Sequence, residues 1–489
     1  MSKQAPKFSI SREAISAVYR AGEGAVIALV EGLVQQHIEL EARIKSLEDK
    51  QKKTSHNSSK PPSGDGFGKR TKSLREKSER PSGGQPGHPG STLEWREEVD
   101  DVVTHSVHEC QSCGASLVMA PVIEHDLRQV HELPPLRLQV IEHQAEVKCC
   151  GDCKAVSRGT FPADVSAPVQ YGSGVRGLMV YLMDAQLLPS QRTCEVLSEV
   201  FGFEVSEGTL YNARAQCFEQ LAPVEQAIKA GIAAADVVHF DETGLRVNGK
   251  LWWLHVASTA ALTYYFVHVK RGREAIEQMD VLPNFSGISV HDGWASYFLD
   301  ECAHSLCNAH HLRELRFVLE RYEQPWAEQM MTLLSDIKAQ VDIAKADGQR
   351  ALSASQLADF EHRYQTLLTD GFEANLPPPV EADAPKKRGR KKQSPPKNLL
   401  DRLDLHDTAV LAFMYDFRVP FDNNQAERDV RMMKLKQKIS GCFRAATSSQ
   451  QFCRIRGYLS TLRKQGLSVL DALRSAFTGI PVLPALQPE

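Results

Sequence analysis

The chain has 489 residues, of which 42% are apolar and 24% are charged, and its 58 Lys and Arg nearly balance 61 Asp and Glu. This composition excludes a disordered or fibrous protein, and the length predicts about three folded domains with linkers. No apolar run approaches the roughly 20 residues that span a bilayer, and the first residues lack the apolar stretch of a secretory signal. We therefore expect a cytoplasmic protein without a membrane partner, whose eleven cysteines are thiols or metal ligands.

Residues 1–50 are predicted to contain a helix with an apolar seam. The seam positions alternate spacings of four and three, which is typical of a short coiled coil that would join two copies of the chain. An amphipathic helix packed on the core of its own chain is an equally good interpretation. The seam consists of Val26, Val30, Leu33, His37, Leu40, Ile44 and Leu47.

Residues 51–94 are predicted to be a basic linker. They are rich in Ser, Pro, Gly and Lys, a composition that buries too little apolar surface to fold alone. Between residues 51 and 90, nine basic residues face three acidic ones. The linker is therefore also a candidate for contact with nucleic acid phosphates, and a solvated spacer is the alternative.

Residues 95–165 are predicted to form a small β-rich module that binds zinc. Four thiolates in two Cys-x-x-Cys pairs are the ligand set of a closed, structural zinc site. Cys149 leaves the third ligand open, and His105 or His108 could substitute for a thiolate. The paired ligands are Cys110 with Cys113 and Cys150 with Cys153.

Residues 166–232 are predicted to be helical and to bind DNA. The run from Glu195 to Gln216 resembles a helix-turn-helix, with a turn at Gly202 and a second helix that Ser206 would cap. Because many short helix pairs only pack against each other, ordinary helix packing is the alternative interpretation.

From residue 233 to 445 the sequence predicts a mixed sheet with helical cover. VVHFDET, KLWWLHVAST, LTYYFVHV and GISVHDGW have the pattern of strands, and REAIEQM that of a helix. Asp241 and Asp292 each follow an apolar strand and precede a turn that contains glycine. If those strands are neighbours, both carboxylates lie at one sheet edge, where divalent cations find oxygen ligands.

A dense group of thiols and imidazoles lies in ECAHSLCNAHHLREL. Structural hydrogen bonding is the preferred interpretation over a second zinc site, because no set of four ligands is evident. Cys307 and His310 are three residues apart, a spacing that can share a helix face. The group consists of Cys302, His304, Cys307, His310 and His311.

The remaining chain is predicted to be helical at residues 309–376, a basic loop at 377–398, and helical again from Asn424 through a tail at 446–489. The helix near Asn424 carries a third acid, Glu427, on one face with cations. Ten basic residues face one acid between residues 428 and 464, so we expect DNA phosphates beside them, with a solvated face as the alternative. The residues expected to hold DNA are Arg431, Lys434, Lys438 and Arg444.

Several motifs together resemble the insertion sequence 66 family of transposases. They are HNSSKPPS, GGQPGHPG, the paired cysteine motifs, HFDETG, VHDGWASY, LCNAHHLREL and NNQAERDVRMMKLKQKISGCFR. The resemblance implies a multidomain α+β chain whose ribonuclease H-like core carries an Asp-Asp-Glu triad of Asp241, Asp292 and Glu427. It further implies a helical insertion over about residues 309–420 and a structural role for Cys307 and His310.

The same resemblance implies DNA transposition with two Mg²⁺ or Mn²⁺ ions at the triad. Water would release a 3′-hydroxyl at each end of the element, and that hydroxyl would then attack target DNA, a transfer suited to two cations about 3.5–4 Å apart. The expected partners are double-stranded DNA in the nucleoid, a second copy of the chain, and accessory proteins of the same element. A non-catalytic DNA-binding descendant and a purely hydrolytic nuclease are the alternatives.

Overall fold

The structure, a computed structural model, describes residues 11–54, 56–58, 93–162, 164–376 and 393–486. Most of the expected linker, including GGQPGHPG, lies outside these described residues, as does most of the expected basic loop. The chain forms two compact units. Unit 1 contains Met1–Ser73, Thr160–Ser190 and Gly208–Glu489. Unit 2 contains Leu74–Gly159 and Gln191–Glu207. The expected core, its insertion and the C-terminal helices therefore share one unit.

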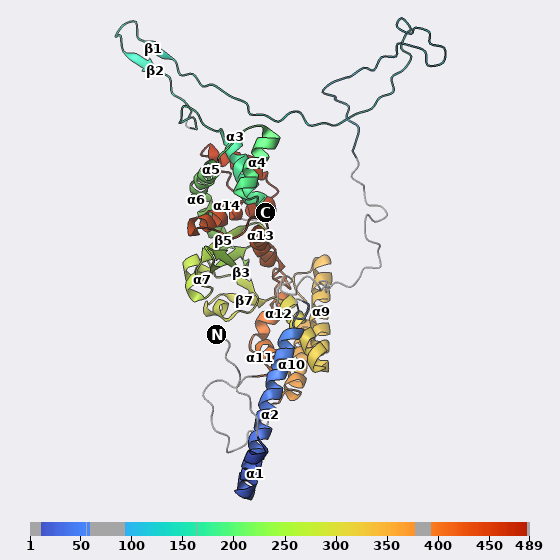
Figure 1. Ribbon diagram of the computed structural model, residues 1–489, viewed down its shortest axis with the longest axis vertical. Helices are drawn as coiled ribbons and strands as arrows, with labels where there is room; N and C mark the ends of the chain where they lie inside the picture. Colours follow the sequence, from blue (N-terminus) through green and yellow to red (C-terminus); the bar gives the residue numbers. More distant parts are fainter. Residues whose placement is uncertain (1–10, 55, 59–92, 163, 377–392, 487–489) are drawn as a thin grey trace. The chain divides into compact units, whose positions relative to one another are not determined.

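The centre of unit 1 is a five-stranded mixed sheet in the order β5-β4-β3-β6-β7 (Figure 1). β3 (Val237–Val247), β4 (Lys250–Ser258) and β5 (Thr263–His268) are antiparallel neighbours, whereas β6 (Ile288–His291) and β7 (Ala303–Leu306) run parallel to β3. The first four strands, and α7 (Arg273–Met279) before β6, confirm the sequence prediction. β7 was not predicted, because its four residues carry no run of alternating apolar side chains.

One face of the sheet is covered by α13 (Asn424–Ser440) and α14 (Ala446–Lys464). Alternate side chains along a strand point to opposite faces, and Leu245 and Val247 of β3 share an apolar cluster with Val430 and Met433 of α13. Asp241, four residues before Leu245, therefore points to the face that α13 covers. Its neighbour Glu242 points to the other face.

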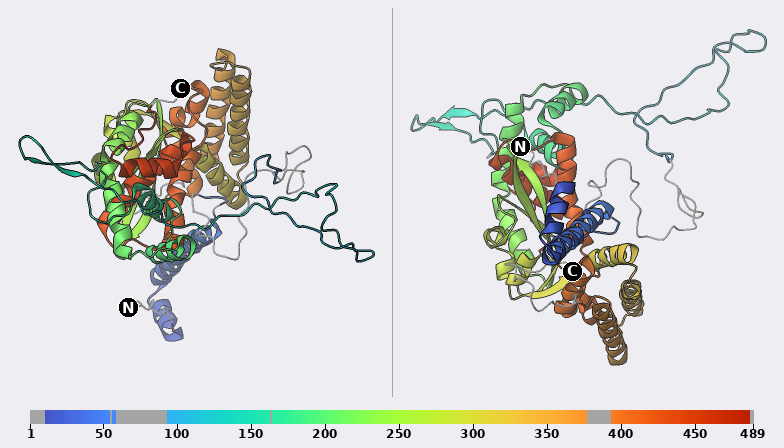
Figure 2. Two further views of the ribbon diagram at one scale, coloured as in Figure 1. Left: turned by 90° about the horizontal axis from the view of Figure 1, so that it is seen from above. Right: turned by 60° about the horizontal axis from the view of Figure 1, so that its bottom comes forward.

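The helices after β7 form a bundle with its own apolar core. Leu306 joins this core to the sheet, and Leu333, Leu400 and Phe413 are among its buried members. Figures 1 and 2 show the bundle extending away from the β7 side of the sheet. Its helices are α8 (Asn308–Tyr322), α9 (Pro325–Ala346), α10 (Ala354–Glu373), α11 (Pro395–Leu405) and α12 (Asp407–Tyr415).

The start of α11 corrects the expected loop at residues 377–398. Ser394 accepts a hydrogen bond from the backbone N–H of Lys397 at 3.3 Å, and Pro395 occupies the first turn of the helix. Proline is favourable there because the first helical N–H groups have no partner within the helix. The prolines that suggested a breaker therefore begin a helix.

Unit 1 has a second layer of helices, in which a buried ion pair joins two of the helices. Asp184, in the π-helix η2 (Tyr181–Ala185), accepts from Arg214 of α5 (Glu207–Gln220) at 2.7 Å. Buried charges are stable only when paired in this way. The layer also contains α3 (Ser173–Val180), α6 (Ala222–Ala233) and α15 (Val469–Phe477). None of the helices in the described part of the chain has the length and apolar character needed to cross a membrane.

The two helices of the expected helix-turn-helix are present around a turn at Gly202. Gly202 adopts φ +70°, a left-handed conformation that favours glycine at a helix end. The first helix, α4 (Ser190–Phe201), falls almost entirely in unit 2, whereas α5 falls almost entirely in unit 1.

The N-terminal residues form α1 (Arg12–Arg20) and the long α2 (Glu23–Lys52). The seam of α2 is uncovered in the single chain, with Leu33, Leu40 and Leu47 exposed by 43%, 56% and 57%. The end of α2 is anchored to α8, because Asp49 accepts hydrogen bonds from Arg321 at 2.9 Å and Tyr322 at 2.8 Å. The alternative interpretation, that this helix packs on its own chain, therefore holds only for the last turns of α2.

The expected β-rich module of unit 2 contains little regular structure. Within residues 93–162 the described strands are β1 (Val147–Cys149) and β2 (Val156–Arg158), together with an isolated bridge from Glu109 to Ser116. The apolar residues that suggested strands are exposed, Val140 by 91% and Ile141 by 66%. Alternation alone does not hold a strand without a facing apolar layer.

The first turn of α13 is fixed by Asn423, whose side chain is buried. Its Nδ2 donates to the carbonyl of Phe240 in β3 at 2.8 Å, and its Oδ1 lies 2.8 Å from Nδ1 of His239. Its backbone N–H donates to Sγ of Cys307 at 3.1 Å. One residue thus ties α13 to the central strand and to the beginning of α8.

Replacing Asn423 with alanine should lower the free energy of unfolding by about 2 to 4 kcal/mol, because buried groups left without a partner cost about 1 to 3 kcal/mol each. Urea unfolding of the full chain measures this change. Asn424→Ala alters the exposed neighbour and serves as the control. Equal unfolding midpoints for the two variants would contradict the role of Asn423.

Candidate active site

Asp241 lies within β3, and Asp292 directly follows β6, the parallel neighbour of β3. The register of β3 and β6 pairs His239 with Val290, and continuing it by two residues sets Asp292 level with Asp241. Asp241 pairs with Val256 inside the β3–β4 ladder, so the prediction that a turn follows it is wrong, because the strand continues through Gly244 to Val247. Asp292 lies near enough for its charge to raise the pKa of Asp241.

Glu427 lies in that first turn and adds a third carboxylate. Burial raises the pKa of Asp241 well above its usual value, and the negative charges of Glu242, Asp292 and Glu427 raise it further. Burial also raises the pKa of Asp292, with Glu242 adding to the effect. Buried like charges are unfavourable alone, and a divalent cation bound by their oxygens would offset the repulsion. Among the described residues, however, oxygens of Asp241, Asp292 and Glu427 do not all lie within 4.8 Å of one another, so the structure does not bring the predicted triad to metal-ligand distance.

Backbone N–H groups orient the two aspartates. The N–H of Glu242 donates to Oδ1 of Asp241 at 2.8 Å, and the N–H of Trp294 donates to Oδ1 of Asp292 at 3.0 Å. Each of these bonds engages Oδ1. Each carboxylate is thus held in one orientation by a neighbouring backbone N–H.

The fourth acid of the cluster, Glu242, is held by other groups. Its Oε1 accepts from Nη2 of Arg271 at 2.5 Å, and its Oε2 accepts from the hydroxyl of Tyr297. Arg271 in turn lies between the rings of Trp253 and Trp294, 5.0 and 4.4 Å from their centroids. Since both oxygens of Glu242 are engaged, Asp241 is the acid of this pair that is available to a ligand. Sequence reasoning missed Arg271 and Tyr297, which no motif spacing marks.

Glu427 is surrounded by cationic and imidazole groups. Its carboxylate lies 3.3 Å from Arg431, 3.6 Å from Arg313 and 3.9 Å from Nδ1 of His310. The pair with Arg431 follows from their spacing of four residues on one helix face. Arg313 was not identified from the sequence, although it lies within LCNAHHLREL.

The thiols and imidazoles of residues 302–311 separate into different environments. Nδ1 of His304 lies 3.2 Å from Nε2 of His291, and Nδ1 of His311 lies 3.0 Å from Oδ1 of Asn308, so hydrogen bonding accounts for both rings, as predicted. Cys307 and His310 lie instead beside Glu427. Burial raises the pKa of the Cys307 thiol to about 12 and lowers the pKa of His310 to about 3.

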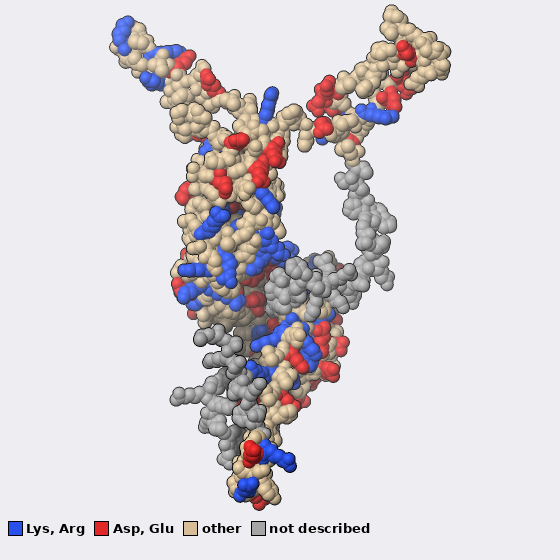
Figure 3. Space-filling view, in the orientation of Figure 1, with Lys and Arg blue, Asp and Glu red and all other residues tan. Residues whose placement is uncertain are grey.

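The four residues expected to hold DNA are all exposed. Arg431, Lys434, Lys438 and Arg444 lie on α13 and just beyond it, and Figure 3 shows basic side chains gathered on the face where α13 runs. Lys434 also donates to the carbonyl of Gly244 at 2.6 Å, which holds its ammonium group near the sheet.

Other members of the basic run serve the interior. Arg454 pairs with Glu225 at 2.8 Å, and Lys464 pairs with Asp429 at 3.0 Å. Arg456 is buried and donates to backbone carbonyls of η2. The expectation that the whole run needs an external anion is therefore wrong for these three, because each binds an internal acid or backbone carbonyls.

The two Cys-x-x-Cys pairs of unit 2 form turns with matching hydrogen bonds. The N–H of Cys110 donates to the carbonyl of Ala115, and the N–H of Cys150 donates to that of Ala155, both at 2.8 Å. Backbone hydrogen bonds of these turns lower the pKa of both cysteines. Cys150 thus corresponds to Cys110, whereas Cys149 is the last residue of β1. Among the described residues the two pairs do not meet at metal-ligand distance.

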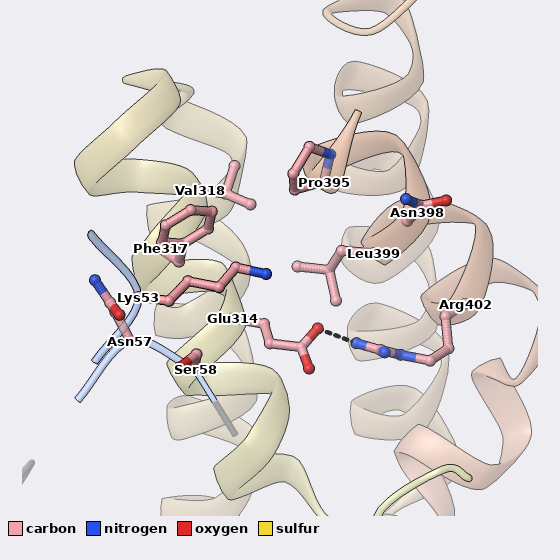
Figure 4. Close-up of a pocket in the computed structure, with 10 residues that line it drawn as sticks. All are labelled: Lys53, Asn57, Ser58, Glu314, Phe317, Val318, Pro395, Asn398, Leu399 and Arg402. Atoms are coloured by element: carbon pink, nitrogen blue, oxygen red, sulfur yellow. Dashed lines mark hydrogen bonds and ion pairs between the residues drawn. The ribbon is translucent and has the colours of Figure 1, made fainter. Parts of the chain in front are cut away.

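A cavity of about 570 Å³ lies between α8, α11 and the segment after α2 (Figure 4), and the charge of its lining residue Arg402 partly offsets the rise that burial causes in the pKa of Asp292. Phe317 and Leu399 supply apolar walls, and the ion pair of Arg402 with Glu314 lies at its side. The described part of HNSSKPPS borders this cavity, where Asn57 donates to Glu320 at 2.9 Å. That motif therefore docks on α8, the helix that begins beside Cys307.

The family model of the IS66 transposases matches residues 168–451, more than half of the chain. The chain belongs to the IS66 family of transposases. A family of unknown function, DUF6444, matches residues 17–94. The uncharacterized protein y4hP of Sinorhizobium fredii (strain NBRC 101917 / NGR234) is 24% identical over 172 residues, which are 32% of this chain and 30% of that protein. The match thus spans less than a third of the relative's length.

The IS66 match contains every part of the carboxylate cluster. It begins ahead of α3, includes the whole sheet and the insertion bundle, and ends within α14. Asp241, Asp292 and Glu427 therefore all lie in the part of the chain that defines the IS66 family. The zinc-ligand candidates and α2 lie outside that match.

Asp241→Asn should stabilise the metal-free protein at pH 7. The raised pKa of Asp241 means that its contribution to stability is lost as the pH rises through the folded-state value. Removing the charge should raise the free energy of unfolding by roughly 1 to 3 kcal/mol, the scale of one like-charge pair about 5 Å apart at an effective dielectric constant of about 20.

Urea unfolding in the presence of a chelator measures this change. Asp236→Asn removes the charge of an exposed acid just ahead of β3 and is the control, whose unfolding midpoint should stay close to that of the wild type. A lower midpoint for Asp241→Asn than for the wild type would contradict the electrostatic account.

Proposed function

We propose that this IS66 chain cleaves and joins DNA at the ends of its own mobile element, with Asp241, Asp292 and Glu427 as an Asp-Asp-Glu triad that holds two Mg²⁺ or Mn²⁺ ions. The observation that carries the proposal is that Asp241 on β3, Asp292 directly after the neighbouring strand β6, and Glu427 in the first turn of α13 lie near enough for the charges of the other two acids to raise the pKa of Asp241. Their mutual repulsion is the condition that divalent cations relieve.

The sheet supports a ribonuclease H-like core. Acids stand on its first and fourth strands in chain order, β3 and at the end of β6, and these two strands are neighbours in space. The helical bundle α8 to α12 lies in sequence between the last strand and the helix of Glu427, which is the place expected for the insertion.

The chemistry is phosphoryl transfer in two steps. First, a water oxygen bonds to phosphorus at the element end, and the 3′ oxygen leaves with a proton. Second, this 3′-hydroxyl bonds to a phosphorus of the target and displaces another 3′ oxygen. Bound cations would lower the pKa of the attacking hydroxyl and neutralise the leaving oxygen.

The residues around the triad have separate roles in this proposal. Backbone N–H groups fix the aspartate oxygens, so little reorganisation is needed when the phosphodiester arrives. Four exposed cations would contact the phosphates of the DNA backbone. They are Arg431, Lys434, Lys438 and Arg444.

Asp241→Asn should abolish cleavage and leave DNA binding intact. With Mg²⁺ and a labelled duplex that carries the element ends, the wild type should give nicked and joined products, and the variant should be slower by at least about 10³-fold, the scale for loss of a group that stabilises charge in the transition state. Asp236→Asn changes an exposed acid just ahead of β3 and is the control.

The outcomes of this assay separate the possible functions. Nicking without joining by the wild type would indicate a hydrolytic nuclease, and a gel shift without any product would indicate a DNA-binding protein. Cleavage by Asp241→Asn at the wild-type rate would reject the triad.

The cysteine pairs of unit 2 are proposed to hold one structural Zn²⁺ ion through Cys110, Cys113, Cys150 and Cys153. The matching turns support this set over one that uses Cys149. Cys150→Ser should lose about one equivalent of zinc per chain, since a closed site needs four ligands, and Cys149→Ser should retain it. Mass spectrometry of the intact, folded protein measures the metal, and equal zinc contents in the two variants would contradict the assignment.

The uncovered seam of α2 is proposed to pair with the same seam of a second copy. Leu33→Asp with Leu40→Asp should shift the full chain from dimer to monomer in light scattering, because charge at seam positions opposes burial. Gln35→Asp, an exposed position outside the seam, is the control. An unchanged mass would remove the seam from the account of assembly.

A further inference from the structure

Cys307, His310 and Glu427 converge where β7 passes into α8. One ligand atom from each lies within 4.8 Å of the other two, the only such group of three that the described residues contain. The register of β6 and β7 pairs His291 with Leu306, the last residue of each strand. Cys307 therefore follows β7 as Asp292 follows β6. The group therefore adjoins the carboxylate cluster without using either aspartate.

Two polar atoms of this group are buried and face each other without a hydrogen bond. Neither Nδ1 of His310 nor Oε1 of Glu427 has a hydrogen-bond partner within the described part of the chain, and the guanidinium of Arg313 lies 3.6 Å from that oxygen, beyond hydrogen-bond distance. The two atoms lie 3.9 Å apart, which is too long for a direct hydrogen bond. Buried polar atoms are almost always satisfied by protein, water or an ion. A cation between them would accept a lone pair from each, and Cys307 would supply a third.

We propose that Cys307, His310 and Glu427 bind a thiophilic divalent cation, Zn²⁺ in the first instance. Bonds of about 2.0 to 2.3 Å place tetrahedral ligand atoms roughly 3.3 to 3.7 Å apart. The three side chains therefore need to approach by roughly 1 Å to complete the site. The side chains of His310 and Glu427 are 14% and 20% exposed, which provides an entry path and a fourth position for water.

The donor set distinguishes this site from the carboxylate cluster. Thiolate and imidazole select zinc over magnesium, whereas oxygen ligands alone favour magnesium. The backbone N–H of Asn423 donates to Sγ of Cys307 at 3.1 Å. Such a hydrogen bond orients a metal-binding sulfur. Glu427 has two carboxylate oxygens, so it can face both sites. The inference does not depend on DNA cleavage.

Titration of the metal-free full chain with Co²⁺ tests the site. Cobalt bound to thiolate gives a charge-transfer absorption, and mass spectrometry counts the bound metal. The wild type should bind one more equivalent than Cys307→Ser, whatever the cysteines of unit 2 hold. Cys302→Ser changes another buried cysteine of the same region and should bind as the wild type does.

A second variant, His310→Gln, tests the site independently in case Cys307→Ser does not fold. It keeps the sulfur, changes a side chain that reaches solvent, and should weaken cobalt binding at this site by at least about 10-fold, since even outer ligand partners have effects of that size. Urea unfolding midpoints show whether each variant is folded. An unchanged cobalt count in folded Cys307→Ser, or wild-type affinity in His310→Gln, overturns the site.

One further variant separates this inference from the proposed function. Asp241→Asn should still bind cobalt at Cys307, and excess Mg²⁺ should not displace it. Failure of DNA cleavage with normal cobalt binding would reject the proposed function alone. Cleavage together with an unchanged cobalt count in Cys307→Ser would reject this site alone.

Discussion

The hydrogen bonds of Asn423 hold the first turn of α13 on the central strand, and the position of Glu427 depends on them. A helix that lies on a sheet through apolar contacts alone can shift along it, because such contacts have little directional preference. Asn423 supplies direction, since its side chain reaches the carbonyl of Phe240 and the ring of His239. The apolar cluster beneath Val430 and Met433 then fixes the rest of the helix.

The pleat of β3 gives its two adjacent acids different environments. Asp241 points toward α13 and is exposed to the charges of Asp292 and Glu427, whereas Glu242 points to the opposite face and is neutralised by Arg271 and Tyr297. Two adjacent carboxylates of one strand can thus have opposite effects on the stability of the fold. Asp241 costs stability without a counterion, whereas Glu242 joins β3 to Arg271 and Tyr297.

The sequence predicted the parts of the fold that depend on local pattern. Strand and helix periods gave four of the five strands and the insertion helices, because alternation and amphipathic spacing reflect burial directly. β7 escaped prediction because it is short, and α11 because its prolines look the same in a loop and in a first helical turn.

The surroundings of the carboxylates could be predicted only in part. Motifs marked Asp241, Asp292 and Glu427, whereas Arg271, Arg313 and Tyr297 reach the cluster through tertiary contacts that no spacing encodes. Charge counting likewise could not distinguish exposed Arg431 from buried Arg456, since both belong to one basic run and differ only in what surrounds them.

The order of these acids along the chain sets when their cluster can exist. Glu427 follows the whole insertion bundle, so during synthesis the ribosome delivers it long after β3 and β6 have emerged. A nascent or prematurely terminated chain therefore has the two strand acids but not the third. The helices α8 to α12 separate the third acid from the first two, so only a chain translated as far as α13 carries all three.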